Sequence, residues 1–243
     1  MNPRDLLIER CPSGVPGFDD LCQGGLVRNS VNVLIGGPGA GKTTFLMNFL
    51  WNGVNKFNEN GLFVSFEPDV LELFKDASTY GWDFEKLDSR GTCKFMKVSP
   101  QTSMSELKKE LTRVVTKYGI KRLCFDPVSM LGSMEGDESK ARQEIYDLMA
   151  LFKRLQVTVL FSDEAPSQEE AAGVIMAGAR SQFTRFLTDG VIDLYSSGLG
   201  GVSDRAVRIV KMRRTNHSRG PIPMHITNEG IVVLSKKGKG LGL

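Results

Sequence analysis

Short apolar runs alternate with stretches of helical character along the first two thirds of the chain. The apolar runs are rich in β-branched and aromatic residues, as buried strands of a parallel sheet are. They cover residues 31–35, 62–67, 93–98, 122–126 and 157–162. Helices are expected between them, over residues 45–51, 68–80, 103–118 and 139–155. This alternation predicts an α/β fold with a mostly parallel twisted sheet flanked by helices.

The pattern changes towards the C-terminal end, where strand-like segments follow one another with only turns between them. These segments cover residues 191–195, 206–212, 223–226 and 231–234. Such a cluster predicts an antiparallel extension of the sheet. Residues 163–179, before the change, are expected to form a loop. Near Ser103, a Glu106 three residues later forms a capping-box pattern that begins a helix.

Length and composition fit one globular domain. The chain has 243 residues, of which 41% are apolar and 24% charged, which is ordinary for a single α/β domain. We therefore expect one domain over residues 1–243, with residues 1–11 as a lead-in and residues 236–243 as a flexible basic Gly/Lys tail. The sequence has no long apolar run and no secretory leader, so we expect a cytoplasmic protein without a membrane partner. The four cysteines show no paired spacing and are expected to be buried, reduced residues.

One glycine-rich stretch carries the clearest chemistry. It fits the pattern of glycine, any four residues, glycine, lysine and then Ser or Thr, between an expected strand and an expected helix. The stretch consists of Gly36, Gly37, Pro38, Gly39, Ala40, Gly41, Lys42, Thr43 and Thr44. Glycines let the backbone curl with its N–H groups pointing inward, and the following helix adds the positive end of its dipole. The sequence therefore predicts a nucleoside-triphosphate site in which Lys42 contacts the terminal phosphates and Thr43 ligates Mg²⁺.

Two acidic residues end apolar strands that should lie beside this loop. Ligands of parallel sheets bind beyond the carboxyl ends of the strands, where Glu67 and Asp126 are expected. We expect Asp126 to hold Mg²⁺ together with Thr43, and Glu67 to orient a water for attack on the γ-phosphate. The alternative for Asp126 is a turn residue at a strand end.

Several motifs together resemble the KaiC-like branch of the RecA/RadA ATPases. Besides the glycine loop they comprise residues 13–19, 24–26, 65–67, 80–83, 186–191 and 211–217 and the strand that ends at Asp126. They occur in family order over residues 12–234. The resemblance implies a RecA-like P-loop core that assembles into a ring-type homo-oligomer, often a hexamer, with ATP at the subunit interfaces. Single-domain members of this kind are typical of archaea.

The resemblance also implies a role for two basic residues late in the chain. Lys211 and Arg213 match the family's lysine-any-arginine pair, which reaches the γ-phosphate bound by the neighbouring subunit. Glu67, Lys42, Lys211 and Arg213 are then the expected catalytic residues. Alternation along a strand places Lys211 and Arg213 on one face. The alternative is a solvated basic strand face.

Some positions depart from the family pattern. Pro68 follows Glu67 where the family commonly has a second glutamate, so we expect slow hydrolysis. Arg214 stands where the family usually has glycine. Arg185 and Phe186 occupy the positions of a Ser-Thr pair that is autophosphorylated in the family's clock protein, so autokinase activity is not expected.

Charge is unevenly distributed along the chain. Residues 203–239 hold nine Lys/Arg and two acids, a net charge of +7 where the whole chain has +3. This basic segment is a candidate DNA-binding patch. The loops expected to face the centre of a ring, residues 132–142 and 163–180, carry more acidic than basic residues, which disfavours DNA in the pore.

The sequence thus predicts a Mg²⁺-dependent, RecA-like ATPase that acts as a homo-oligomer, with a further protein partner left open. One alternative is a RadA-paralogue, ATP-dependent DNA-binding accessory of recombination or repair. A second alternative is a slowly hydrolysing nucleotide switch or signalling scaffold.

Overall fold

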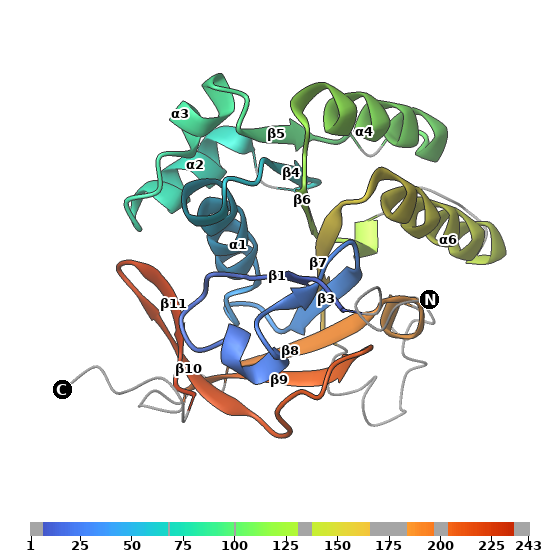
Figure 1. Cartoon of the computed structure of the whole chain (residues 1–243). Helices are drawn as coiled ribbons and strands as arrows, with labels where there is room; N and C mark the ends of the chain where they lie inside the picture. The colour runs from blue at the N-terminus through green and yellow to red at the C-terminus, as the bar shows by residue number, and fades with distance from the viewer. Residues whose placement is uncertain are drawn as a thin grey trace.

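The computed structural model describes residues 7–67, 69–99, 101–130, 138–165, 184–196 and 204–235. Within these ranges the core is a nine-stranded sheet with the order β11-β10-β9-β8-β3-β7-β6-β4-β5 (Figure 1). Its parallel strands are β3 (Val31–Gly36), β4 (Gly61–Ser65), β5 (Cys93–Lys97), β6 (Arg122–Asp126), β7 (Thr158–Glu164) and β8 (Gly190–Ser196). The antiparallel strands β9 (Arg205–Met212), β10 (Ile222–Thr227) and β11 (Gly230–Val233) continue the sheet from β8. The predicted parallel sheet with an antiparallel extension is confirmed.

Two groups of helices cover the parallel part of the sheet, one on each face (Figure 1). The first comprises α1 (Lys42–Phe57), α2 (Val70–Ser78) and α3 (Phe84–Ser89), and the second comprises α4 (Met104–Tyr118) and α6 (Glu138–Leu155). Alternate strand residues enter the two cores: Leu34 packs with the α1 side, whereas Val33 and Ile35 pack with the α4 and α6 side. This arrangement explains why the strands read as continuous apolar runs.

The helix boundaries follow local sequence signals. The Ser103 hydroxyl accepts a hydrogen bond from the Glu106 N–H at 3.2 Å, while the Glu106 carboxylate accepts one from the Ser103 N–H at 2.9 Å. The predicted capping box is therefore confirmed. Helix α2 begins at Val70, after an Asp69 side chain that accepts from the Leu71 N–H. Pro68, where the helix was expected to begin, lies outside the described residues.

The N-terminal segment forms a small sheet of its own beside the main one. Strands β1 (Arg10–Cys11) and β2 (Leu26–Val27) pair antiparallel, and a 3-10 helix, η2 (Asp19–Cys22), lies between them. We call residues 9–28 the N-terminal hairpin. The four cysteines of the chain are free and buried, as predicted. Among the described residues, none of the helices has the length and apolarity needed to traverse a lipid bilayer.

Candidate nucleotide-binding site

The glycine loop connects β3 to α1 at the carboxyl edge of the sheet. Gly39 and Gly41 have φ values of +72° and +95°, in the left-handed region that favours glycine. A Cβ on Gly36 would lie 2.7 Å from the Leu194 carbonyl oxygen of β8, so this position must also lack a side chain. By contrast, Cβ atoms on Gly37 and Gly39 would meet nothing within 4 Å. The loop is therefore tightly packed where it leaves β3 and open further along, where a ligand could approach its backbone.

Lys42 places a positive charge across this loop. Its Nζ donates to the carbonyl oxygens of Gly36 at 2.8 Å and Gly37 at 3.1 Å. Lys42 is also the first residue of α1, so the ammonium lies beside the unpaired N–H groups and the positive dipole end of that helix. A lysine cation and the N-terminus of a helix thus belong to the same loop, and both favour an anion such as phosphate.

Oxygen atoms from three elements meet beside Lys42. Thr43 Oγ1, in α1, donates to Asp126 Oδ2 at 2.5 Å, and Asp126 is the last residue of β6. The other oxygen of this buried carboxylate, Oδ1, accepts from the hydroxyl of Ser162 in β7. Carboxylate and hydroxyl oxygens are ligands that suit Mg²⁺, which usually keeps several waters and takes few protein ligands. The donor set therefore fits this ion, with Ser162 orienting the carboxylate.

Glu67 lies on the same edge of the sheet. Ser65, two residues before it, pairs with Asp126 across β4 and β6, and the Phe66 N–H donates to the Asp126 carbonyl oxygen at 3.1 Å. The Glu67 carbonyl accepts from Lys97 Nζ at 3.1 Å, while its side chain is exposed. The structure thus brings Lys42, Thr43 and Asp126 together. Glu67 was expected to end its strand, but β4 stops at Ser65 because the chain bends at residues 66–67, so this acid lies two residues beyond the strand.

Two residues of this edge escaped the sequence analysis, Ser162 and Asp163. Residues from 163 onward were expected to form a loop, but β7 continues to Glu164 because Asp163 and Glu164 pair with Ile35 and Gly36 of β3. Asp163 is 4% exposed. Burial raises its pKa to about 6, although the Glu164 N–H and the nearby charges of Arg185 and Lys42 oppose the shift. The signal that could have found both residues is the apolar strand immediately before them, which also marks Asp126.

Lys211 and Arg213 occupy the opposite edge of the sheet. Strand β9 runs antiparallel to β8, so Met212 pairs with Gly190 at the start of β8, whereas Gly36 of the loop pairs with Leu194 near its end. One chain therefore does not bring this pair to its own glycine loop. A phosphate contacted by both regions would have to lie between two chains.

The pair is held in place by the segment that precedes β8. Lys211 Nζ donates to three carbonyl oxygens, those of Arg185 at 3.2 Å, Phe186 at 3.2 Å and Thr188 at 2.7 Å. Burial, followed by the charge of Arg213, lowers the pKa of Lys211. Arg213 Nη1 lies 3.6 Å from Oδ1 of the buried Asp189, with 55% of the arginine side chain exposed. Both side chains thus face the segment 185–189, and Arg213 also reaches solvent.

The predictions about DNA concerned two acidic loops and the basic segment 203–239. Most of the two loops lies in residues 131–137 and 166–183, which are outside the described residues, as are the lysines at 236, 237 and 239. The described part of the basic segment lies on β9 and the residues after it. Of its cations, Arg205 Nε donates to the Gly39 carbonyl oxygen at 3.3 Å and thus contacts the glycine loop.

Comparison with known proteins agrees with this geometry. The chain matches the protein family described as "ATPase: KaiC" over residues 11–238. It is 32% identical over 233 residues to the circadian clock oscillator protein KaiC of Parathermosynechococcus lividus, which covers 92% of this chain and 42% of that protein. The protein of the same name from Parasynechococcus marenigrum (strain WH8102) is 30% identical over 235 residues, with coverages of 93% and 45%. The chain thus spans less than half the length of these relatives.

A solved structure extends the likeness to the fold. The crystal structure of a KaiC-like protein from the hyperthermophilic archaeon Pyrococcus horikoshii OT3 matches with a TM-score of 0.81 and 31% identity. The match covers 93% of this chain and 99% of that one. The resemblance inferred from the motifs, and the RecA-like fold that it implied, are confirmed.

Proposed function

This chain belongs to the KaiC family of RecA-like, ATP-binding ATPases, and from that premise we propose that it hydrolyses ATP with Mg²⁺ at the glycine loop. The observation that carries the proposal is the 2.5 Å hydrogen bond from Thr43 Oγ1 to Asp126 Oδ2. It joins the start of α1 to the end of β6, so the phosphate-binding and metal-binding groups meet at one point. Such convergence is what phosphoryl transfer needs, because positioning and charge neutralisation supply most of its catalysis.

Different residues of the site bind the phosphates, bind the metal and position the water. Lys42 and the loop amides hold the phosphates, while Thr43 and Asp126 hold the metal. When bound, Mg²⁺ would neutralise charge that develops on the phosphate oxygens. Glu67, two residues after β4, orients the attacking water. Since Pro68 stands where the family commonly has a second glutamate, one carboxylate does this work and turnover is slow.

Lys211 and Arg213 complete the site of a neighbouring subunit. Their place on the edge opposite the glycine loop supports this assignment, because a head-to-tail arrangement of chains brings opposite edges of two subunits together. A head-to-tail contact that closes on itself forms a ring, and we propose a hexamer built from single domains that each comprise residues 1–243. Arginine supplied by a neighbour would stabilise the transition-state charge.

Two measurements on the full chain test this function. Phosphate release should require both ATP and Mg²⁺, and the particle mass in Mg-ATP should be about six times that of the 26.8 kDa chain. Calorimetry that detects no uptake of Mg-ATP by the folded protein would remove the nucleotide site. A protein that stays monomeric at all nucleotide concentrations yet turns over ATP would remove the shared site alone.

One observation also favours the nucleotide switch as a second candidate. The Glu67 carboxylate makes neither a hydrogen bond nor an ion pair with any residue in the described ranges, so nothing there fixes its direction. Tight ATP binding with negligible turnover would identify the switch. Strong stimulation of turnover by single-stranded DNA would instead favour the recombination accessory and its basic C-terminal segment.

A further inference from the structure

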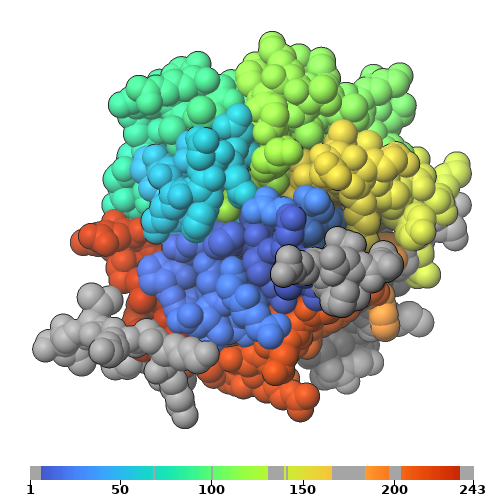
Figure 2. All heavy atoms as spheres, in the orientation of Figure 1, coloured from blue at the N-terminus to red at the C-terminus, as the bar shows by residue number. Residues whose placement is uncertain are grey.

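Arg10, at the start of the N-terminal hairpin, contacts the segment that follows β9. Its Nη1 donates to Thr215 Oγ1 at 2.7 Å, and its Nη2 donates to the Arg214 carbonyl oxygen at 3.1 Å. The Gln23 side chain joins them, because its Oε1 accepts both from Arg10 Nη2 at 3.3 Å and from the Asn216 N–H at 3.0 Å. Figure 2 shows the N-terminal segment (blue) lying against the C-terminal strands (orange-red) on one face of the molecule. Two regions about two hundred residues apart in the sequence are thus hydrogen-bonded side by side.

These contacts reach the backbone of Arg213. The Thr215 hydroxyl that accepts from Arg10 also donates to the Arg213 carbonyl oxygen at 3.2 Å. On the other side, the Arg213 N–H donates to the Asp189 carbonyl oxygen at 2.9 Å. Both polar groups of the Arg213 backbone are therefore hydrogen-bonded: the N–H to Asp189, just before β8, and the carbonyl oxygen to Thr215, which Arg10 of the hairpin contacts. Arg214, the next residue, has a φ of +57°, which a non-glycine residue adopts only where its surroundings hold it.

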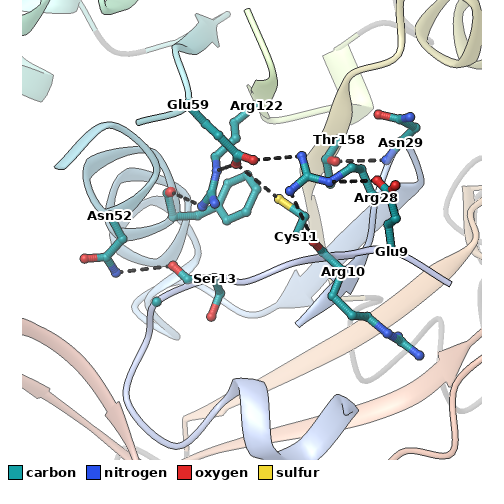
Figure 3. Close-up of polar contacts among 12 residues, drawn as sticks. Glu9, Arg10, Cys11, Ser13, Arg28, Asn29, Asn52, Glu59, Arg122 and Thr158 are labelled. Atoms are coloured by element: carbon teal, nitrogen blue, oxygen red, sulfur yellow. Dashed lines mark hydrogen bonds and ion pairs between the residues drawn. The ribbon is translucent and has the colours of Figure 1, made fainter. Parts of the chain in front are cut away.

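The hairpin is in turn anchored to the core of the domain (Figure 3). Arg122 of β6 is fully buried, with its Nε 2.7 Å from Glu59 Oε2. Arg28, at the end of the hairpin, places Nη1 2.7 Å from the other oxygen of the same carboxylate. The Arg28 Nη2 also donates to the Arg10 carbonyl oxygen at 3.2 Å. In Figure 3 the Arg10 side chain points away from this ion cluster, so its backbone is fixed at the core while its guanidinium reaches outward.

We propose that Arg10 is a positioning residue for Arg213: it fixes the turn after β9 and thereby sets where the Arg213 side chain enters the neighbouring subunit's site. This inference depends on the proposed role of Arg213 in trans. Arg10 itself donates to neutral oxygens of its own chain and does not touch nucleotide. A planar guanidinium can serve several acceptors in one fixed geometry, which a lysine ammonium on a flexible stem does not reproduce.

The first experiment compares Arg10→Ala with wild type in steady-state ATPase assays on the full chain. We expect kcat to fall about tenfold, because small displacements of a catalytic group are costly, while the Kd for Mg-ADP stays unchanged. Arg10→Lys should recover part of the loss. Arg113→Ala is the matched control, since Arg113 pairs only with Glu110 of the same helix in the described structure and is 58% exposed.

The second experiment separates positioning from a merely structural effect. Arg10→Ala subunits keep an intact glycine loop and Glu67, while Glu67→Gln subunits keep an intact Arg10 and Arg213. In rings mixed one to one, about a quarter of the interfaces combine the intact halves of the two variants. Turnover above the mean of the two separate preparations supports the proposal. A mixture that reaches only that mean overturns it, as does unchanged kcat in Arg10→Ala.

Two further variants cover the cases in which Arg10→Ala does not fold or Arg213 does not act in trans. If Arg10→Ala fails to fold, Thr215→Val removes the bridging hydroxyl with little change of shape, and it should lower kcat and complement Glu67→Gln in the same way. Unchanged turnover in folded Thr215→Val would then overturn the proposal. Arg213→Ala tests the premise: if this variant retains full turnover, the trans assignment is wrong and the inference falls with it. Suppose instead that Arg213→Ala loses turnover and regains it when mixed with Glu67→Gln, whereas Arg10→Ala shows neither effect. Then the role of Arg213 in trans stands, and only the positioning role of Arg10 is wrong.

Discussion

The two edges of the sheet are built in different ways. At the carboxyl edge, nine consecutive residues form the glycine loop, Asp126 ends the neighbouring strand β6, and Glu67 follows the end of β4 by two residues. The opposite edge, where the parallel strands begin, is the amino edge. There the Arg213 N–H donates to Asp189, and Arg10 of the hairpin donates to Thr215, which is 205 positions away in the sequence. The first edge is a local motif supported by the strands; the second is assembled by long-range hydrogen bonds. In the proposed shared site, the glycine loop comes from a local sequence motif. The position of Arg213 comes from contacts between segments that are far apart in the sequence.

The largest expected effect comes from removing the cation of the amino edge. Arg213→Ala should lower kcat about a thousandfold, the scale of an arginine supplied by a neighbour. Nucleotide affinity should change little, because the glycine loop of each subunit is intact. Phosphate-release assays with Arg213→Ala, Glu67→Gln and their mixture check this prediction. Absence of recovery in the mixture, with both variants folded and co-assembled, would show that the two edges do not share a site.

Glu67→Gln tests the carboxyl edge. It should retain ATP binding and lose turnover about a hundredfold, since the amide no longer polarises water. Single-turnover assays and calorimetry with Mg-ATP measure the two properties separately. Glu85→Gln, at an exposed position of α3, is the charge-matched control. Equal turnover in wild type and Glu67→Gln would remove Glu67 from its assigned role.

Asp163→Asn probes the buried acid of the same edge through stability. Its folded pKa of about 6 lies above the ordinary value of 3.8, so the folded protein holds this proton more tightly than the unfolded chain does. The free energy of unfolding therefore loses a contribution as pH rises from about 4 to about 6 and stays lower above that range. Asp163→Asn should be more stable than wild type by about 3 kcal/mol at pH 8, with a difference that shrinks towards pH 4.

Urea denaturation at pH 5 and pH 8 measures this effect. Asp76→Asn, on the exposed side of α2, should show the same small change at both values. If Asp163→Asn and wild type differ equally at the two pH values, burial does not raise the pKa of this carboxyl.

The smallest effect is expected from Gln23→Ala at the amino edge. The variant removes an acceptor shared by Arg10 and the Asn216 N–H, yet Arg10 keeps its contacts with Thr215 and Arg214. We expect kcat to fall about threefold, equivalent to less than the net worth of an ordinary hydrogen bond. A loss larger than that of Arg10→Ala would place the main support of this turn on Gln23 instead.

Part of the candidate site could be predicted because its signals are local. The spacing of glycines, Lys42 and Thr43 predicts a curled backbone at the start of a helix, and alternation of strands and helices predicts that Asp126 and Glu67 reach the same edge. Asp163 was assigned to a loop, because the boundary between a strand and a loop depends on the β3 ladder that pairs with it. Ser162 lies within the expected strand, but its hydrogen bond to Asp126 depends on the pairing of β6 with β7. Pairing with β3 extends β7 to Glu164, although the sequence of β7 itself does not indicate a strand there.

By itself, then, the sequence determined the fold class, the family resemblance and the position of the glycine loop between a strand and a helix, since each depends on residues close together in the chain or on their order. Tertiary structure alone decided that Lys211 and Arg213 lie opposite that loop, that Ser162 orients Asp126, and that Arg10 supports the turn after β9. These facts depend on strand direction, register and contacts between distant segments. Hydrogen bonds between residues far apart in sequence form only when the whole sheet brings their elements together, and no local pattern encodes that.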